Sequence, residues 1–100
     1  MENATIIVIN DNEFLRQFEH KTDHGMAKIE YSLQERKIFL TKLIVPEGLD
    51  DVDFKNAFIK TVLDSIQERN LRVVPTSPKI ASFLRKNKQY KDLLPVGVRI

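Results

Sequence analysis

The sequence predicts an α+β fold: a mostly antiparallel sheet with two helices, in the order β-β-β-β-α-β-α. In the first half of the chain, apolar and polar residues alternate over short segments, as they do in half-buried strands. In the second half, apolar residues recur at spacings of three and four, as they do along one face of a helix. A run of strands followed by helices is typical of the α+β class.

Length and composition indicate one domain with a modest core, spanning residues 1–100. Only three Gly and four Pro occur, too few for a low-complexity chain. The absence of Cys excludes disulfides, thiolate metal ligands and a thiol nucleophile. His20 and His24 have too few neighbouring ligands for a metal site, so no metal is expected.

Charge and hydrophobicity also limit the partners. The net charge of +2 does not by itself indicate nucleic acid, and no nucleic-acid partner is expected. Met1-Glu2-Asn3 lacks a basic leader region, and the apolar run from Ile6 to Ile9 is too short for a signal peptide or a membrane span. We therefore expect a cytoplasmic protein with no membrane contact.

Four strands are expected before residue 46. A β-branched run predicts the first, and the cluster Asn10-Asp11-Asn12 after it predicts a turn. Phe14, Phe18 and His20 would share one face of the second strand. The fourth is the most apolar and is therefore expected at the centre of the sheet. The predicted strands cover residues 5–10, 14–22, 26–33 and 38–45.

The longest helix is predicted from Phe54 to Asn70. Asp50 is its expected N-cap, Asp53 is expected to complete a capping box, and Asn70 is the expected stop. The apolar stripe that indicates this helix consists of Phe54, Phe58, Ile59, Val62, Leu63 and Ile66.

A short buried strand at 71–74 and a second helix should follow. Ser77-Pro78 is a helix start, with Ser at the N-cap and Pro at the first helical position. The helix should continue to about Asn87. After it, Tyr90 should pack on the core, and Val96 to Ile100 fit either a last strand or a loose tail.

Several segments of this order resemble the short single-domain GNAT-like N-acetyltransferases. The resemblance spans roughly Phe14 to Leu94 and implies a GNAT-like (acyl-CoA N-acyltransferase-like) fold that binds acetyl-CoA. In that family, the backbone of the strand before the long helix widens at a bulge and holds the pantetheine arm, at positions that match Leu43, Ile44 and Val45. The matching segments are Gly25-Met26-Ala27, Ile29-Glu30-Tyr31, Val45-Pro46-Glu47, Val73-Val74-Pro75-Thr76-Ser77-Pro78, Phe83-Leu84-Arg85 and Tyr90.

The loop before the long helix departs from the family pattern. The family has Arg or Gln, then Gly, then Gly or Ala, so that backbone amides at the helix N-terminus bind pyrophosphate. Those positions are Asp50, Asp53 and Lys55 here, with Asp51 among them. A carboxylate about 5 Å from a phosphate oxygen costs about 3 kcal/mol at an effective dielectric constant of 20. These charges predict weak or lost cofactor binding, unless they hold a cation that bridges to phosphate.

Ser77 and Tyr90 are the candidate catalytic residues. The family commonly has Cys where Ser77 stands, and a Ser hydroxyl needs a nearby base to act as a nucleophile. A helix cap is the simpler interpretation of Ser77. Tyr90 matches the family's Tyr and could protonate a thiolate leaving group, or it could only pack at the edge of the core.

Two functional hypotheses follow. The first is a GNAT-like domain with impaired or lost acetyl-CoA binding that acts as a binding or interaction module without a cofactor. The second is an active acetyl-CoA-dependent N-acetyltransferase with a divergent loop, in which Val45 and a basic helix hold the cofactor. That basic stretch, which also fits a solvated helix face or a surface for an acidic partner, is Lys79, Arg85, Lys86, Lys88 and Lys91. The partner is unknown, and a homodimer through either terminal segment fits both hypotheses.

Overall fold

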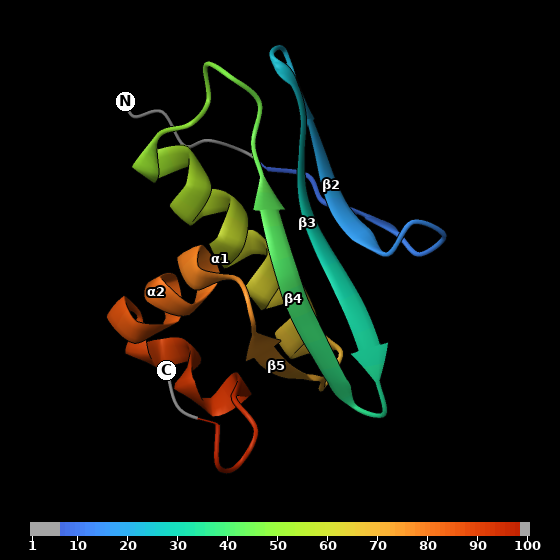
Figure 1. Cartoon of the computed structure of the whole chain (residues 1–100), viewed down its shortest axis with the longest axis vertical. Helices are drawn as coiled ribbons and strands as arrows, with labels where there is room; N and C mark the ends of the chain where they lie inside the picture. The colour runs from blue at the N-terminus through green and yellow to red at the C-terminus, as the bar shows by residue number, and fades with distance from the viewer. Residues whose placement is uncertain (1–6, 99–100) are drawn as a thin grey trace.

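The computed structural model describes residues 7–98. It confirms the predicted α+β order, with a short 3-10 helix added after the second helix (Figure 1). No helix in this part of the chain is long and apolar enough to cross a membrane. The elements are β1 (Asn10–Asn12), β2 (Gln17–Thr22), β3 (Gly25–Gln34), β4 (Lys37–Ile44), α1 (Val52–Glu68), β5 (Arg72–Pro75), α2 (Pro78–Lys86) and η1 (Lys88–Leu93).

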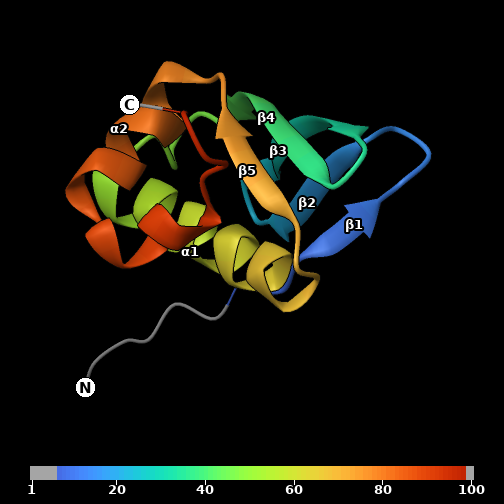
Figure 2. The same ribbon diagram turned by 90° about the horizontal axis from the view of Figure 1, so that it is seen from below.

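The sheet has the strand order β1-β2-β3-β4-β5. The first four strands pair in antiparallel fashion, and β5 joins β4 in parallel. β4 therefore lies inside the sheet, although β3 rather than β4 is its middle strand. Figure 2 shows that α1, α2 and η1 all lie on the same face of the sheet, so the core forms between that face and the helices.

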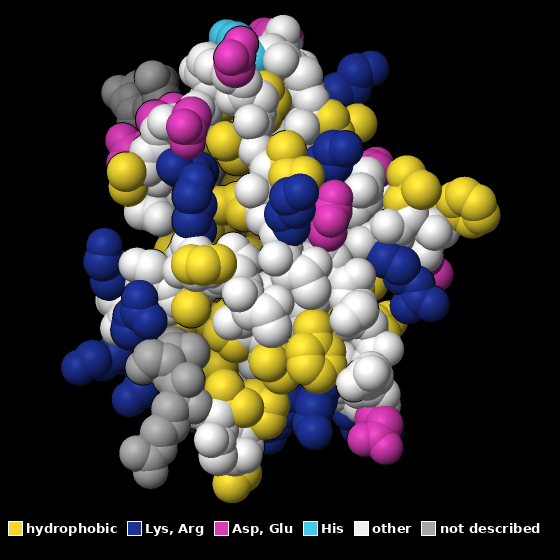
Figure 3. All heavy atoms as spheres, in the orientation of Figure 1, with side chains coloured by type: hydrophobic (Ala, Val, Ile, Leu, Met, Phe, Trp, Pro, Cys, Tyr) yellow, Lys and Arg dark blue, Asp and Glu magenta, His cyan; other side chains and the backbone are white. Residues whose placement is uncertain are grey.

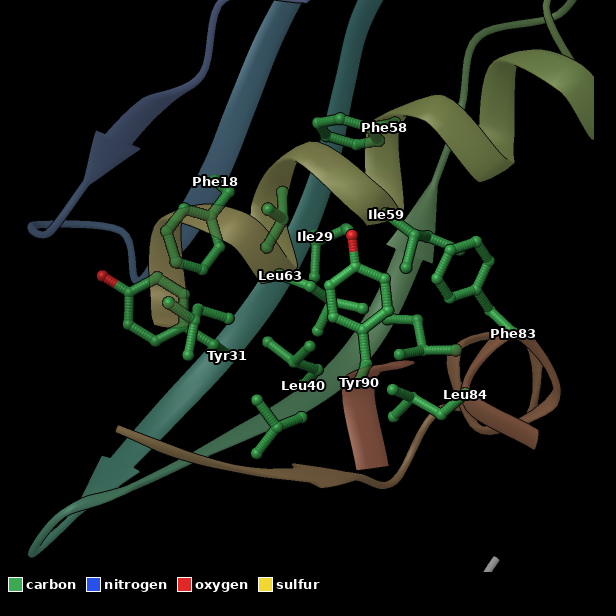
Figure 4. Close-up of a cluster of buried hydrophobic side chains, with 14 of the residues drawn as sticks. Phe18, Ile29, Tyr31, Leu40, Phe58, Ile59, Leu63, Phe83, Leu84 and Tyr90 are labelled. Carbon is green, nitrogen blue, oxygen red and sulfur yellow. The ribbon is translucent and has the colours of Figure 1, made fainter. Parts of the chain in front are cut away.

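The core uses the predicted apolar stripe of α1, because all six residues of that stripe are buried. From the sheet, Phe18, Ile29 and Leu40 pack against it, and Phe83 and Tyr90 extend the same cluster toward the C-terminal part of the chain (Figure 4). One continuous hydrophobic cluster thus holds both helices against the sheet.

The start of the chain differs from the prediction. The strand expected at 5–10 lies partly outside the described residues, and residues 7–9 form no strand. Asn10-Asp11-Asn12, the expected turn, is instead β1, and the turn lies at residues 13–16. Phe14, expected within a strand, lies in this turn and is 93% exposed.

Cross-strand polar bonds explain why turn-forming residues make a strand here. The Tyr31 hydroxyl donates to Asp11 Oδ1, and Arg69 donates to Asp11 Oδ2 over 2.7 Å. The side-chain amides of Asn10 and Asn12 both donate to the Glu19 carboxylate. Most of these polar bonds therefore go to neighbouring elements, while Asn12 Oδ1 also accepts the Leu15 N–H over 3.0 Å and so holds the turn that follows β1.

The start of α1 differs from the prediction, because the helix begins at Val52 instead of Phe54 and its N-cap lies one residue later than expected. Asp51, not Asp50, is the N-cap, and its Oδ1 accepts the backbone N–H of Phe54 over 2.8 Å. Because the cap is Asp51, the third residue after it is Phe54, so Asp53 cannot complete a capping box. The end agrees with the prediction, since Asn70 follows the C-cap in the left-handed conformation (φ 59°).

The C-terminal segment has no strand in its described part. Residues 96–98 form a turn in which the Val98 N–H donates to the Pro95 carbonyl over 3.1 Å. The rest of the expected strand or tail, residues 99–100, lies outside the described residues.

Phe58 provides a test of the core. Its side chain is fully buried and its ring stacks on Phe54 with the centroids 6.0 Å apart. Phe58→Ala should lower the free energy of unfolding by about 3–5 kcal/mol, measured by urea denaturation. Gln67→Ala, on the exposed side of the same helix, is the control and should change it by less than about 0.5 kcal/mol. Equal effects of the two substitutions would contradict this packing.

Candidate functional site

β4 and the edge strand β5 separate at Leu40. β4 and β5 pair only from Lys37 with Arg72 to Leu40 with Pro75. The Leu40 carbonyl then accepts the backbone N–H groups of Thr76 and Ser77, both over 3.1 Å. After this point β5 turns into α2, whereas β4 continues to Ile44 without a neighbour on that side (Figure 1).

A bulge in β4 changes which backbone groups face the separation. Leu40 pairs with Tyr31 and Lys42 with Glu30, so Thr41 is an extra residue in β4. Because residues of an antiparallel pair alternate in the direction of their hydrogen bonds, the bulge turns the N–H and C=O of Leu43 toward the side that β5 has left. Of the three positions that the family resemblance assigns to the pantetheine arm, Leu43 therefore faces the separation.

A groove of about 330 Å³ opens between β4, α1 and α2. Its walls combine apolar side chains with three lysines, and Figure 3 shows hydrophobic side chains in this hollow with Lys and Arg side chains beside it. Ile44 and Val45 do not line it. The lining residues are Leu43, Val52, Lys55, Asn56, Ile59, Pro78, Lys79, Ser82, Phe83, Lys86 and Asn87.

One carboxylate stands at the lysine side of the groove. Asp50 Oδ1 accepts a hydrogen bond from Lys55 Nζ over 2.7 Å. This hydrogen bond, followed by the charges of Lys55 and Lys79, lowers the pKa of Asp50. Lys55 thus neutralises Asp50, and the lysines make the rest of this rim positive.

The N-terminus of α1 is already capped by the chain itself. The Asp51 carboxylate accepts the Phe54 N–H, one of the free amides with which a helix N-terminus binds an anion. Lys55 stands where the family has Gly or Ala, and its side chain lines the groove. The residues present therefore do not fit a pyrophosphate bound at this helix end.

A bridging cation has no ready site in this loop either. Asp50 is engaged with Lys55 and Asp51 with the backbone of Phe54. Among residues 7–98, no group of three or more His, Cys, Asp or Glu side chains is arranged to hold a metal ion.

Ser77 is the N-cap residue of α2, as predicted, but its side chain makes no capping hydrogen bond. The residue is only 5% exposed and does not line the groove, although Pro78 and Lys79 beside it do. Its backbone N–H donates a hydrogen bond to the Leu40 carbonyl. Its clearest contribution in the structure is therefore to the separation of β4 and β5.

Tyr90 belongs to η1 and reaches α1 with its hydroxyl, and it does not line the groove. Its hydroxyl donates to Asp64 Oδ1 over 2.8 Å, and Lys60 Nζ binds the other oxygen of Asp64 over 3.0 Å. Figure 4 shows the hydroxyl directed toward α1. Burial, followed by the hydrogen bond and charge of Asp64, raises the pKa of Tyr90. To protonate a leaving group in the groove, the hydroxyl would have to leave Asp64.

Sequence reasoning did not identify the groove, although part of its signal was present. The basic stretch predicted from the sequence includes Lys79 and Lys86, and together with Ser82 these residues follow the spacing of one helix face. Lys55 lies on another helix, and no local spacing relates it to them. Arg85 is exposed and does not line the groove.

The two helix caps give a matched prediction. Asp51→Ala removes a capping hydrogen bond and should lower the free energy of unfolding by about 1 kcal/mol. Ser77→Ala removes a hydroxyl that makes no capping bond and should cost less than about 0.5 kcal/mol. Urea denaturation of both variants checks this, and a larger loss for Ser77→Ala than for Asp51→Ala would contradict the two cap geometries.

Tyr90→Phe should destabilise the fold by about 1 kcal/mol at neutral pH, because it removes the bond to Asp64. The raised pKa of folded Tyr90 means that its contribution is complete below the ordinary value of 10.0 and is lost as the pH rises through the folded value. The difference between wild type and Tyr90→Phe should therefore shrink above pH 10, measured by urea denaturation at several pH values. A difference that stays constant would contradict the raised pKa.

Comparisons with known proteins agree with this fold. A solution structure of a GCN5-like protein from Staphylococcus aureus matches with a TM-score of 0.69 and 20% sequence identity, over 93% of this chain and 91% of that one. No curated protein matches the sequence. The family model of the GCN5-related N-acetyl-transferases matches residues 17–93, which include every element from β2 to η1. The chain therefore belongs to the GCN5-related N-acetyl-transferase (GNAT) family.

Proposed function

We propose that this domain keeps the GNAT fold, has impaired or lost acetyl-CoA binding, and acts as a binding module through the groove between β4, α1 and α2. The observation that carries the proposal is the hydrogen bond from the Phe54 N–H to the Asp51 carboxylate. An internal anion occupies the end of α1 at which the family's cofactor would place its pyrophosphate. A phosphate there would find the Phe54 N–H already hydrogen-bonded and would be repelled by the Asp51 carboxylate.

The charges around the helix end add to this argument. Lys55 neutralises Asp50, so Asp50 opposes a phosphate less than a free carboxylate would. Asp51 and Asp53 remain at the first turn of α1, and neither forms an ion pair with a described residue. Both are exposed, so salt weakens their repulsion of a phosphate without removing it.

An active acetyltransferase is the second candidate, favoured by the separation of β4 and β5 and by the three groove lysines. In that case the phosphates would rest on Lys55, Lys79 and Lys86 instead of on helix amides. The catalytic roles are less well supported, because Ser77 lies outside the groove and Tyr90 donates to Asp64.

Thermal unfolding with acetyl-CoA tests the proposal. A ligand at a hundred times its dissociation constant stabilises a fold by about 2.7 kcal/mol, which raises the melting temperature of a domain this size by several degrees. We expect no such rise with millimolar acetyl-CoA, with or without Mg²⁺. A clear rise for the wild-type protein without metal would reject the proposal and favour the active enzyme.

A repaired loop provides the complementary test. Asp50→Arg combined with Asp51→Gly and Asp53→Gly frees the Phe54 N–H and restores charges suited to phosphate. This variant should gain measurable affinity for acetyl-CoA by calorimetry. A control with the same change in net charge, Glu13→Arg with Asp23→Gly and Glu35→Gly, alters exposed positions outside the groove and should gain none. Equal gains in both variants would show that overall charge, not the helix end, limits binding.

A further inference from the structure

We propose that the groove between β4, α1 and α2 binds a small amphipathic monocarboxylate. The ligand's carboxylate would lie between Lys55 and Lys79, and its apolar chain would lie along Leu43, Ile59 and Phe83. This inference rests on the proposed function in one respect, namely that acetyl-CoA does not occupy the groove.

The first support is the shape and lining of the groove. Ile59 and Phe83 are almost fully buried and form an apolar wall, to which Leu43 and Pro78 contribute. The volume of about 330 Å³ is at the lower end of the range for small-molecule sites. At about 30 Å³ for each water molecule, this volume corresponds to roughly ten waters, so it suits a ligand of on the order of ten non-hydrogen atoms. A chain of six to eight carbons with one head group is of this size.

The second support is the carboxylate that the protein itself places at the rim. Asp50 bonds to Lys55 Nζ over 2.7 Å, so a carboxylate oxygen is already accommodated at this point. The Asp50 side chain is 65% exposed on a loop, whereas that of Lys55 is only 19% exposed and lines the groove. Asp50 can therefore turn outward to solvent while Lys55 remains to receive another carboxylate.

The third support is the distribution of charge. Lys55, Lys79 and Lys86 line the groove, and no acidic side chain does. The lysines can cover apolar surface with their stems and keep their ammonium groups at the rim. Such a site favours a ligand with one anionic head on an apolar chain, because Asp51 and Asp53 at the start of α1 would repel further negative charge.

Titration calorimetry with octanoate, below its micelle concentration, tests the inference on the wild-type chain. Octanoate should bind, whereas acetate, which lacks the chain, and octylamine, which has the opposite charge, should not. Octyl phosphate distinguishes the head groups: binding tighter than that of octanoate would overturn the assignment to a carboxylate. Absence of octanoate binding at millimolar concentration would also overturn it.

Substitution of Asp50 gives the most specific test of the carboxylate position. Asp50→Asn removes the competing carboxylate and should tighten octanoate binding by about twofold to fivefold, as expected for release of one exposed ion pair. The control Asp53→Asn makes the same charge change in the adjacent first turn, where the side chain is not bonded to Lys55, and should leave the affinity unchanged. Equal tightening in both variants would contradict a specific role for the Asp50–Lys55 pair.

Two further variants locate the ligand. Lys79→Gln should weaken octanoate binding, whereas Lys88→Gln, exposed and outside the groove, should not. Ser82→Phe places a ring in the groove and should abolish binding, with circular dichroism showing that the fold is retained. Binding that survives both Lys79→Gln and Ser82→Phe would place octanoate elsewhere and reject the inference.

Acetyl-CoA is titrated alongside octanoate, so that failure of the inference is distinct from failure of the proposed function. If wild-type protein binds acetyl-CoA tightly, the proposed function fails whatever octanoate does. If it binds neither ligand, the proposed function stands and the monocarboxylate inference alone is rejected.

Discussion

The carbonyl oxygen of Leu40 is the point on which the site depends. By accepting the N–H groups of both Thr76 and Ser77, it ends the parallel pairing of β4 and β5 and directs the chain into α2. The Thr76 hydroxyl adds a third hydrogen bond to the same oxygen, over 3.0 Å. Because β5 ends here and the chain continues as α2, the space beside Leu43 is lined by side chains of two helices and not by β5.

A second constraint acts at the other end of that space. The N-terminus of α1 carries partial positive charge and free N–H groups, which can bind either a ligand anion or a carboxylate of the chain itself. In this protein Asp51 takes that place and stabilises the helix. Capping of α1 by Asp51 and binding of an external anion by the same N–H group are therefore alternatives.

The sequence could predict the elements whose signal is periodic, and could not predict the positions that depend on contacts between distant residues. The buried stripe of α1 and the stop at Asn70 follow from local spacing and backbone preference. Asp50 and Asp51 are equally good caps by residue type, and only the structure shows that Asp51 accepts the Phe54 N–H while Asp50 pairs with Lys55. The strand at Asn10–Asn12 depends on Tyr31 and Arg69, far away in the sequence.

The state of the Phe54 amide tests the account most directly, because the account holds that Asp51 keeps this group from the cofactor. Acetyl-CoA can be titrated into ¹⁵N-labelled protein while the backbone amide resonances of Phe54 and Lys55 are followed. The account predicts that neither resonance shifts in the wild-type protein, and that both shift in the variant with Asp50→Arg, Asp51→Gly and Asp53→Gly. Saturable shifts of both resonances in the wild-type protein would contradict it.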